Sequence, residues 1–175
     1  MGTTSTFGFP YPDGSDLVIS GDDVIEALAK KLDDVLKPRW FIASAPTGAG
    51  GFTGAVVPGY VGGAVSTGPD WTWDGAGSFT FSGSAPRWHI ISAGASIYYD
   101  GFNSLSLQVN GAVVVKSFEG APAGAGSVRN KPHSISVPIL LNPSDVVRLS
   151  AEVSDGAFGS DASVEYAYLR GVSLR

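Results

Sequence analysis

Residues 105–115 constrain the fold most strongly, because they have the pattern of a β-hairpin. Every second residue of the first half is apolar: Leu105, Leu107 and Val109. This period of two is typical of a strand with one buried face. Asn110 and Gly111 follow at once, and both tolerate the positive φ angles that a tight type I′ turn requires. We therefore expect Gly111→Val to be harmful and Asn110→Asp to be nearly silent, since Asp-Gly serves the same turn.

Similar alternating runs recur throughout residues 38–175. They fall at residues 78–82, 88–99, 135–141, 147–153 and 164–174, with turn-rich segments between them. The chain has 24 glycines, and only 15% of its residues are charged. Together these features predict an all-β jelly-roll sandwich of about eight to ten antiparallel strands. We expect the first strand to end at Pro46, and residues 47–77 to form a long excursion with one or two short strands.

Residues 1–19 predict an extended arm. Pro10 and Pro12 disfavour helix, and three aromatic side chains precede or separate them: Phe7, Phe9 and Tyr11. An extended segment of this length cannot form a core of its own. The aromatic residues either attach the chain to another protein or pack against the next element of the same chain.

Residues 20–37 predict one short amphipathic helix. Ser20 is a suitable N-cap, Asp22 and Asp23 suit the first turn, and Pro38 ends the segment. Apolar residues recur at spacings of three and four: Ile25, Leu28, Leu32 and Val35. A lone helix this short is marginal in water, so the apolar seam must pack against something. It lies either on its own domain or, as we favour, against copies of itself around an axis.

The sequence contains no pattern that indicates catalysis. Cysteine is absent, and His89 and His133 are distant in sequence, so neither a metal nor another cofactor is expected. We find no phosphate-binding loop and no nucleophile elbow. The net charge of −5 and the scattered basic residues argue against nucleic-acid binding. No apolar run approaches the roughly 20 residues that span a bilayer, and no signal peptide is expected at the start.

One segment has the composition of a ligand site. Asp70, Trp71, Trp73 and Asp74 place two aromatic rings between two carboxylates in a turn-rich region. Aromatic faces stack on sugar rings, and carboxylates accept hydrogen bonds from hydroxyl groups. The alternative is that both tryptophans close one end of the barrel or pack at a subunit contact.

Four segments resemble the trimeric jelly roll of tumour necrosis factor and the complement globular heads, and more closely its version at the C-terminus of bacteriophage tail proteins. They are Trp88–Ile97, Leu105–Gly111, Leu141–Leu149 and Tyr168–Leu174. Ser144-Asp145 stands where that family has Gly-Asp. Residues 8–14 followed by residues 25–29 resemble the opening of phage tail fibres and minor tail proteins.

The resemblance implies a homotrimeric component of a phage virion. The N-terminal arm would bind other virion proteins, and the jelly roll would be displayed outward, on the tail, to bind a host cell-surface glycan. A capsid decoration protein or head fibre is the alternative within this class. A free carbohydrate-binding module is the alternative of another class, and an enzyme with an unrecognised site is the third.

Overall fold

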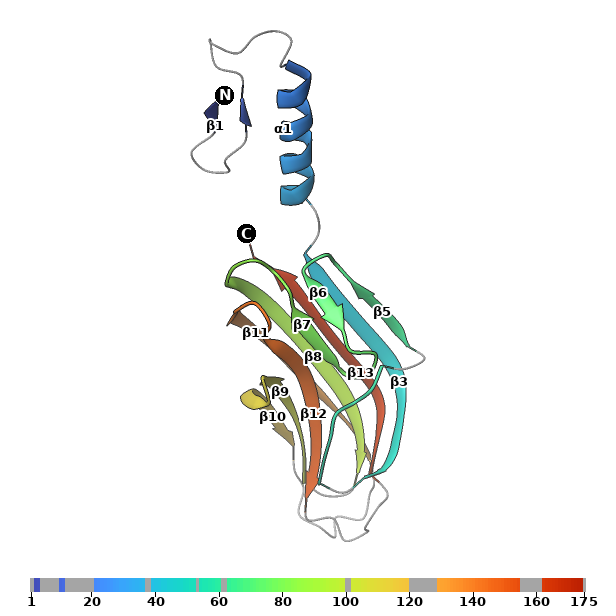
Figure 1. Ribbon diagram of the computed structural model, residues 1–175. Coiled ribbons are helices and arrows are strands. Elements are labelled where there is room, and N and C mark those ends of the chain that lie inside the picture. Colours follow the sequence, from blue (N-terminus) through green and yellow to red (C-terminus); the bar gives the residue numbers. More distant parts are fainter. Residues whose placement is uncertain are drawn as a thin grey trace. The chain divides into compact units, whose positions relative to one another are not determined.

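The computed structural model describes residues 2–3, 10–11, 21–36, 39–52, 54–60, 63–99, 102–119, 129–154 and 162–174. Contacts within the chain group it into two compact units, Met1–Pro38 and Arg39–Arg175 (Figure 1). The first unit contains a short helix, and the second is a β-sandwich.

The N-terminal arm includes two very short strands that pair with each other. Strand β1 (Gly2–Thr3) runs antiparallel to β2 (Pro10–Tyr11), and β2 lies next to the helix. Of the aromatic residues predicted to attach the chain to a particle, Phe7 and Phe9 lie outside the described residues. For Tyr11 only the backbone is described, so the attachment role stays a prediction.

The predicted short helix is confirmed as α1 (Gly21–Leu36). An ion pair between Glu26 and Lys30, one turn apart, supports its exposed side. Three members of the predicted apolar seam are exposed: Ile25, Leu28 and Leu32. The side chain of the fourth, Val35, lies outside the described residues. The three exposed side chains leave an apolar stripe on the helix that favours a partner.

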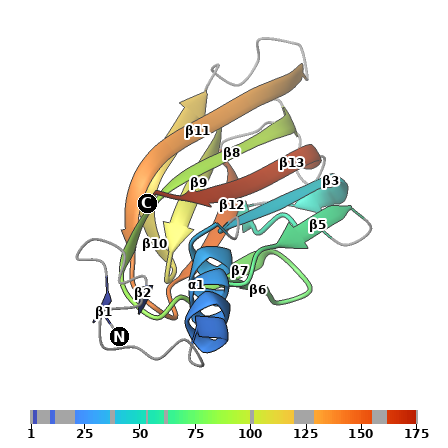
Figure 2. The ribbon, with the colours of Figure 1, turned by 90° about the horizontal axis from the view of Figure 1, so that it is seen from above.

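The second unit consists of two antiparallel sheets, as Figure 2 shows. The five-stranded sheet has the order β11 (Arg129–Leu141), β8 (Arg87–Tyr99), β13 (Ala162–Ser173), β3 (Trp40–Phe52) and β5 (Ala64–Thr67). The six-stranded sheet has the order β10 (Ala112–Glu119), β9 (Phe102–Val109), β12 (Val146–Ser154), β7 (Ser78–Phe81) and β6 (Trp71–Trp73), and β4 (Gly54–Val56) also pairs with β12. This arrangement confirms the predicted jelly-roll sandwich.

The hairpin at residues 105–115 forms as predicted. Asn110 and Gly111 have φ angles of 52° and 83°, and Val109 pairs with Ala112 across the turn. The side chain of Asn110 also reaches a second turn, because its Nδ2 donates to Asp145 Oδ1 at 2.7 Å and its Oδ1 accepts from the Val146 N–H at 2.9 Å. This bond to a carboxylate is a physical reason to expect that Asn110→Asp is not silent.

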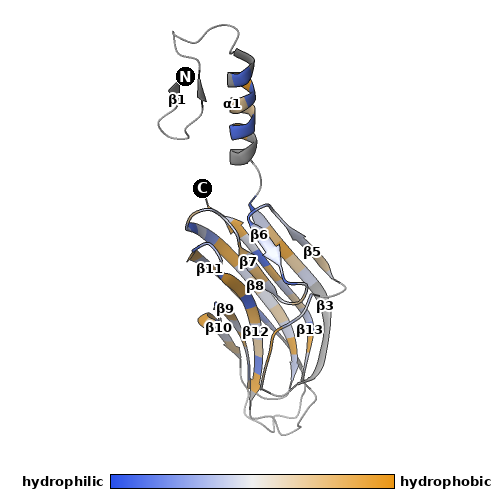
Figure 3. Ribbon diagram, viewed as in Figure 1, coloured by the Kyte–Doolittle hydropathy of each residue, from blue (hydrophilic) through white to orange (hydrophobic). Residues whose placement is uncertain are grey.

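The core lies between the sheets, and both contribute apolar side chains to it. Figure 3 shows hydrophobic residues along the strands of both layers. The largest fully buried side chains include Phe41, Phe79, Phe81, Ile91, Ile97, Leu105, Leu107, Leu141, Leu149 and Leu169. At one point this core is strongly aromatic, since the rings of Phe41 and Phe79 stack with centroids 4.5 Å apart.

The first long strand departs from the sequence prediction. Strand β3 was expected to end at Pro46, yet it continues to Phe52, and Pro46 pairs with Tyr166 of β13. A register shift falls at this point of β13, and the described pairing of the other edge of β3 with β5 ends at Ser44. A proline lacks the N–H that a second neighbour would need, so it is tolerated where a strand has only one. The described part of residues 47–77 holds three short strands, β4, β5 and β6, where one or two were expected.

Candidate functional site

The segment predicted to bind a ligand lies at β6, but its first tryptophan faces the core. Trp71 is only 3% exposed, and its ring lies 4.4 Å from that of Phe41 and 5.4 Å from that of Phe81, measured between centroids. Trp73 is half-buried, and its Nε1 donates to the carbonyl of Ala76 at 3.3 Å. Trp71 therefore does not offer a free face on which a sugar could stack.

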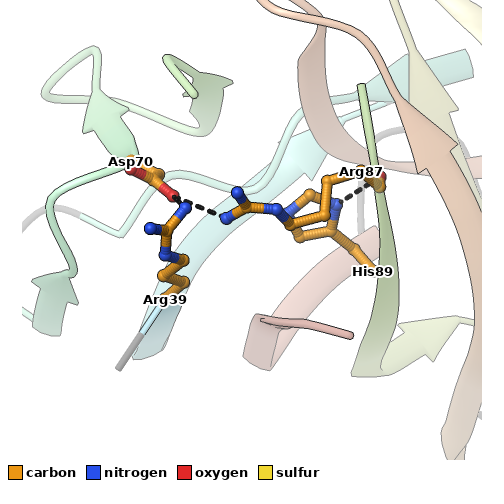
Figure 4. Close-up of polar contacts among 4 residues, drawn as sticks. All are labelled: Arg39, Asp70, Arg87 and His89. Carbon is orange, nitrogen blue, oxygen red and sulfur yellow. Dashed lines mark hydrogen bonds and ion pairs between the residues drawn. The ribbon is translucent and has the colours of Figure 1, made fainter. Parts of the chain in front are cut away.

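Two arginines engage the first carboxylate of the segment. Oδ2 of Asp70 accepts hydrogen bonds from Nη1 of Arg39 and Nη1 of Arg87, each at 3.0 Å (Figure 4). All three side chains are partly buried, so solvent screens the pairs less than it would on an open surface. Asp70 thereby connects the start of β3 to the start of β8.

The second carboxylate closes the turn between β6 and β7. Oδ1 of Asp74 accepts hydrogen bonds from the backbone N–H groups of Ala76 at 2.8 Å and Ser78 at 3.1 Å. Burial alone would raise the pKa of Asp74, but these backbone donors stabilise the charged form and hold the pKa below its usual value. The structure thus gives both acids internal partners. Ligand binding at Asp70–Asp74 stays a prediction, and the alternative of closing one end of the barrel describes Trp71 better.

A buried histidine lies beside this segment. His89 is 0% exposed, its Nδ1–H donates to the carbonyl of Arg87 at 2.9 Å, and its ring meets those of Trp71 and Phe81 edge-on. Burial lowers the pKa of His89, and the bond to the Arg87 carbonyl only partly opposes this effect. This is the structural role that its position on an apolar strand favours.

A second candidate site is the outward surface of the five-stranded sheet, which we call the uncharged face. Its large exposed side chains are Ile42 of β3, Trp88, Ile90 and Tyr98 of β8, Leu140 of β11, and Tyr166 and Val172 of β13. Register brings them together, because Ile90 pairs with Val172 and Trp88 pairs with Leu140. A contiguous apolar surface across four strands is the kind of feature that marks a protein interface.

Charge is sparse on this face. Among the outward paired positions of β3, β8, β11 and β13 that the structure describes, Arg170 is the only charged residue, and Glu165, at the register shift of β13, is a second exposed charge beside them. The guanidinium of Arg170 lies over the ring of Tyr168, 5.2 Å from the centroid. Close packing also occurs here, since a Cβ at Gly94 would lie 2.4 Å from Cε1 of Tyr168. The uncharged face is therefore suited to burial against another apolar surface.

The described residues contain no group of three or more histidines or carboxylates that could hold a metal ion. None of the helices in the described part of the chain is long and apolar enough to cross a membrane.

Comparisons with known proteins identify the fold. No protein-family model and no curated protein matches the chain. Eiger, a tumour necrosis factor of S. frugiperda, is 12% identical over 79% of this chain and 94% of its own, with a TM-score of 0.53. The globular domain of zebrafish complement 1qA is 17% identical over 79% and 98%, with a TM-score of 0.52. Murine APRIL is 7% identical over 79% and 100%, with a TM-score of 0.54.

At these identities the similarity establishes the fold and nothing further. The second unit is a jelly roll of the type found in tumour necrosis factor and complement globular heads, as the sequence resemblance implied. The resemblance to phage tail proteins is not tested by these comparisons and stays a prediction.

Proposed function

We propose that the chain is a homotrimeric, non-catalytic adhesion protein whose three jelly rolls pack through the uncharged face. The observation that carries this proposal is the combination of exposed Trp88, Ile90 and Val172 with sparse charge across four strands. Trp88 alone is 52% exposed, and burying apolar surface contributes about 25 cal/mol per Å². In a closed ring of three chains, the uncharged face of every chain is buried.

The exposed seam of α1 supports the same assembly. Ile25, Leu28 and Leu32 are spaced so that they share one face of the helix, and all three are exposed. Three such helices around one axis would bury this seam, as in a short coiled coil. Sheet and helix would then contribute separately to one trimer.

The proposed setting is a bacteriophage virion. The support is the resemblance of residues 8–14 and 25–29 to the opening of phage tail fibres, together with the division of the chain into Met1–Pro38 and Arg39–Arg175. In this proposal residues 1–37 attach to other virion proteins, and the jelly roll is displayed outward on the tail to bind the host surface. Placement on the capsid, as a decoration protein or head fibre, is the alternative within the proposal. A free carbohydrate-binding module is the alternative outside it.

Two experiments test the two parts of the proposal. Antibodies against the purified chain should label intact phage particles at the tail in electron micrographs. Labelling of the head would favour a capsid protein, and the absence of label from particles would favour a free binding module. A version lacking residues 1–37 should fold and yet fail to join particles, and its continued incorporation would refute the role of the arm.

The trimer interface is tested with Ile90→Asp, which places a charge in the middle of the uncharged face. We expect this variant to be a folded monomer, because the side chain points to solvent within one chain and an unpaired charge is costly only in a buried contact. Val114→Asp, at an exposed position of β10 in the other sheet, is the matched control and should remain trimeric.

A further inference from the structure

The outward surface of the six-stranded sheet carries a stacked aromatic pair, of which one ring is exposed and the other is partly buried. The rings of Phe102 (β9) and Phe118 (β10) stack with centroids 5.6 Å apart and planes 20° apart. Phe118 is 64% exposed, although a buried phenylalanine contributes about 1.5–3 kcal/mol to stability. A ring held open to solvent by a stacked neighbour is a preformed surface for a flat apolar ligand.

Polar groups surround this pair on the same face. Ser104 of β9 pairs with Phe118 on one side and with Glu152 of β12 on the other. Lys116 Nζ lies 2.7 Å from Glu152 Oε2, and both side chains are about half exposed. We call Phe102, Ser104, Lys116, Phe118 and Glu152 the Phe118 platform.

The platform carries one positive and one negative side chain, and each has hydrogen-bonding capacity beyond their ion pair. The bond to Lys116, supported by Ser104, holds the pKa of Glu152 below its usual range, so the carboxylate is ionised at neutral pH. The ion pair uses Oε2, and the ammonium of Lys116 has two further N–H groups. The platform therefore offers an acceptor and a donor beside an apolar ring, with no net charge.

We propose that the Phe118 platform binds a neutral saccharide. A pyranose ring has an apolar C–H face and a rim of hydroxyl groups that both donate and accept hydrogen bonds. The C–H face fits the open face of Phe118, and the hydroxyls fit the carboxylate of Glu152 and the ammonium of Lys116. Strand β9 lies between β10, which carries Phe118, and β12, which carries Glu152, so these two strands are about 10 Å apart. Their side chains can therefore hold one sugar between them.

The location of the platform fits the proposed adhesion function, on which this inference depends. The platform lies on β9, β10 and β12, whereas the uncharged face lies on the other sheet. A trimer built through the uncharged face would thus expose three platforms. Weak single-site binding would then become strong binding to a surface that repeats the same sugar.

The test uses saturation-transfer difference NMR on the full chain with D-glucose, D-galactose and N-acetyl-D-glucosamine at millimolar concentrations. At least one of them should receive saturation on its ring hydrogens. Phe118→Ala should weaken that binding by about tenfold or more. Glu152→Gln, which keeps the side-chain shape, should also weaken it. Val113→Ala removes another exposed apolar side chain of β10 and is the matched control, which should bind like the unaltered chain.

Three results would overturn the proposal. They are the absence of saturation with all three sugars, equal binding by Phe118→Ala and Val113→Ala, and a loss of trimer mass in Phe118→Ala, which would make the platform a subunit contact. Failure of the chain to join virions would refute the proposed setting while leaving sugar binding by the purified protein intact, so the two failures are distinguishable.

Discussion

Replacing Asn110 by Asp should destabilise the jelly roll, although Asp-Gly and Asn-Gly form the same turn. In the structure Asn110 Nδ2 donates to Asp145 Oδ1 at 2.7 Å, and an aspartate at position 110 cannot make this bond. The bond from the Val146 N–H is retained, because a carboxylate oxygen can accept it as the amide oxygen does. The substitution therefore removes one donor and places two carboxylates against each other.

The expected loss is about 2–3 kcal/mol. A hydrogen bond to a charged acceptor contributes about 1.5–3 kcal/mol, and an exposed site favours the lower half of that range. Two like charges about 4 Å apart in water repel by about 1 kcal/mol. For a domain of this size the sum corresponds to a fall in Tm of about 5–15 °C. This loss is far larger than a silent substitution would cause.

Thermal melts at pH 7 provide the assay. Asn110→Gly loses the side-chain bonds without adding charge, so its Tm should fall less than that of Asn110→Asp. A Tm of Asn110→Asp within about 2 °C of the unaltered chain at pH 7 would refute this reasoning.

Three further substitutions or conditions have expected outcomes. Gly111→Val should lower Tm by several degrees in a thermal melt. The nearest atom to an added Cβ is 3.8 Å away, so there is no clash, and the cost of about 1–2 kcal/mol or more is backbone strain at a φ of 83°. An unchanged Tm would mean that the turn relaxes. Ser144→Gly should raise the free energy of unfolding by about 0.5–1 kcal/mol, because Ser144 has a φ of 76° that glycine adopts freely. Urea unfolding should therefore show a higher midpoint, and a lower midpoint would contradict this. Lowering the pH from about 7 to 5 should reduce stability through His89, because burial lowers the pKa of this ring in the folded chain. As the pH falls, the histidine of the unfolded chain is protonated at a higher pH than that of the folded chain, so the stability present above about pH 6.5 is progressively lost. His89→Phe should flatten that part of the urea-stability profile, and an unchanged slope would assign it to other groups.

Local patterns in the sequence were enough to predict the hairpin and most of the strands, though not the full length of β3. The alternation at Leu105 and Leu107 determines which face is buried, and Asn110-Gly111 determines the turn between β9 and β10, because both depend on neighbouring residues only. The positive φ of Ser144 was not predicted, although the jelly-roll family that the sequence resembles has glycine there.

The candidate site at residues 70–74 could not be predicted in this way. Its partners are distant in sequence: Arg39 is 31 residues from Asp70, and Arg87 is 17 residues away. Alternation shows that Trp71 and Trp73 share a face, but not that this face meets the aromatic core of the opposite sheet. Composition and alternation therefore did not show that Trp71 belongs to the core.

The uncharged face was missed for a related reason. Strand β8 is apolar on both sides, with Ile91 and Ile97 inward and Trp88 and Ile90 outward. Alternation assigns one apolar face of this strand to the core and gives no role to the other. Only the strand order, which places β8 between β11 and β13, joins these residues to Leu140 and Val172 in one surface.

The central claim is that three copies of this chain assemble through the uncharged face. Size-exclusion chromatography coupled to light scattering, performed on the full chain at micromolar concentration, tests it most directly. We expect a single species with three times the chain mass of 18.0 kDa. A homogeneous species of 18.0 kDa at that concentration would contradict it.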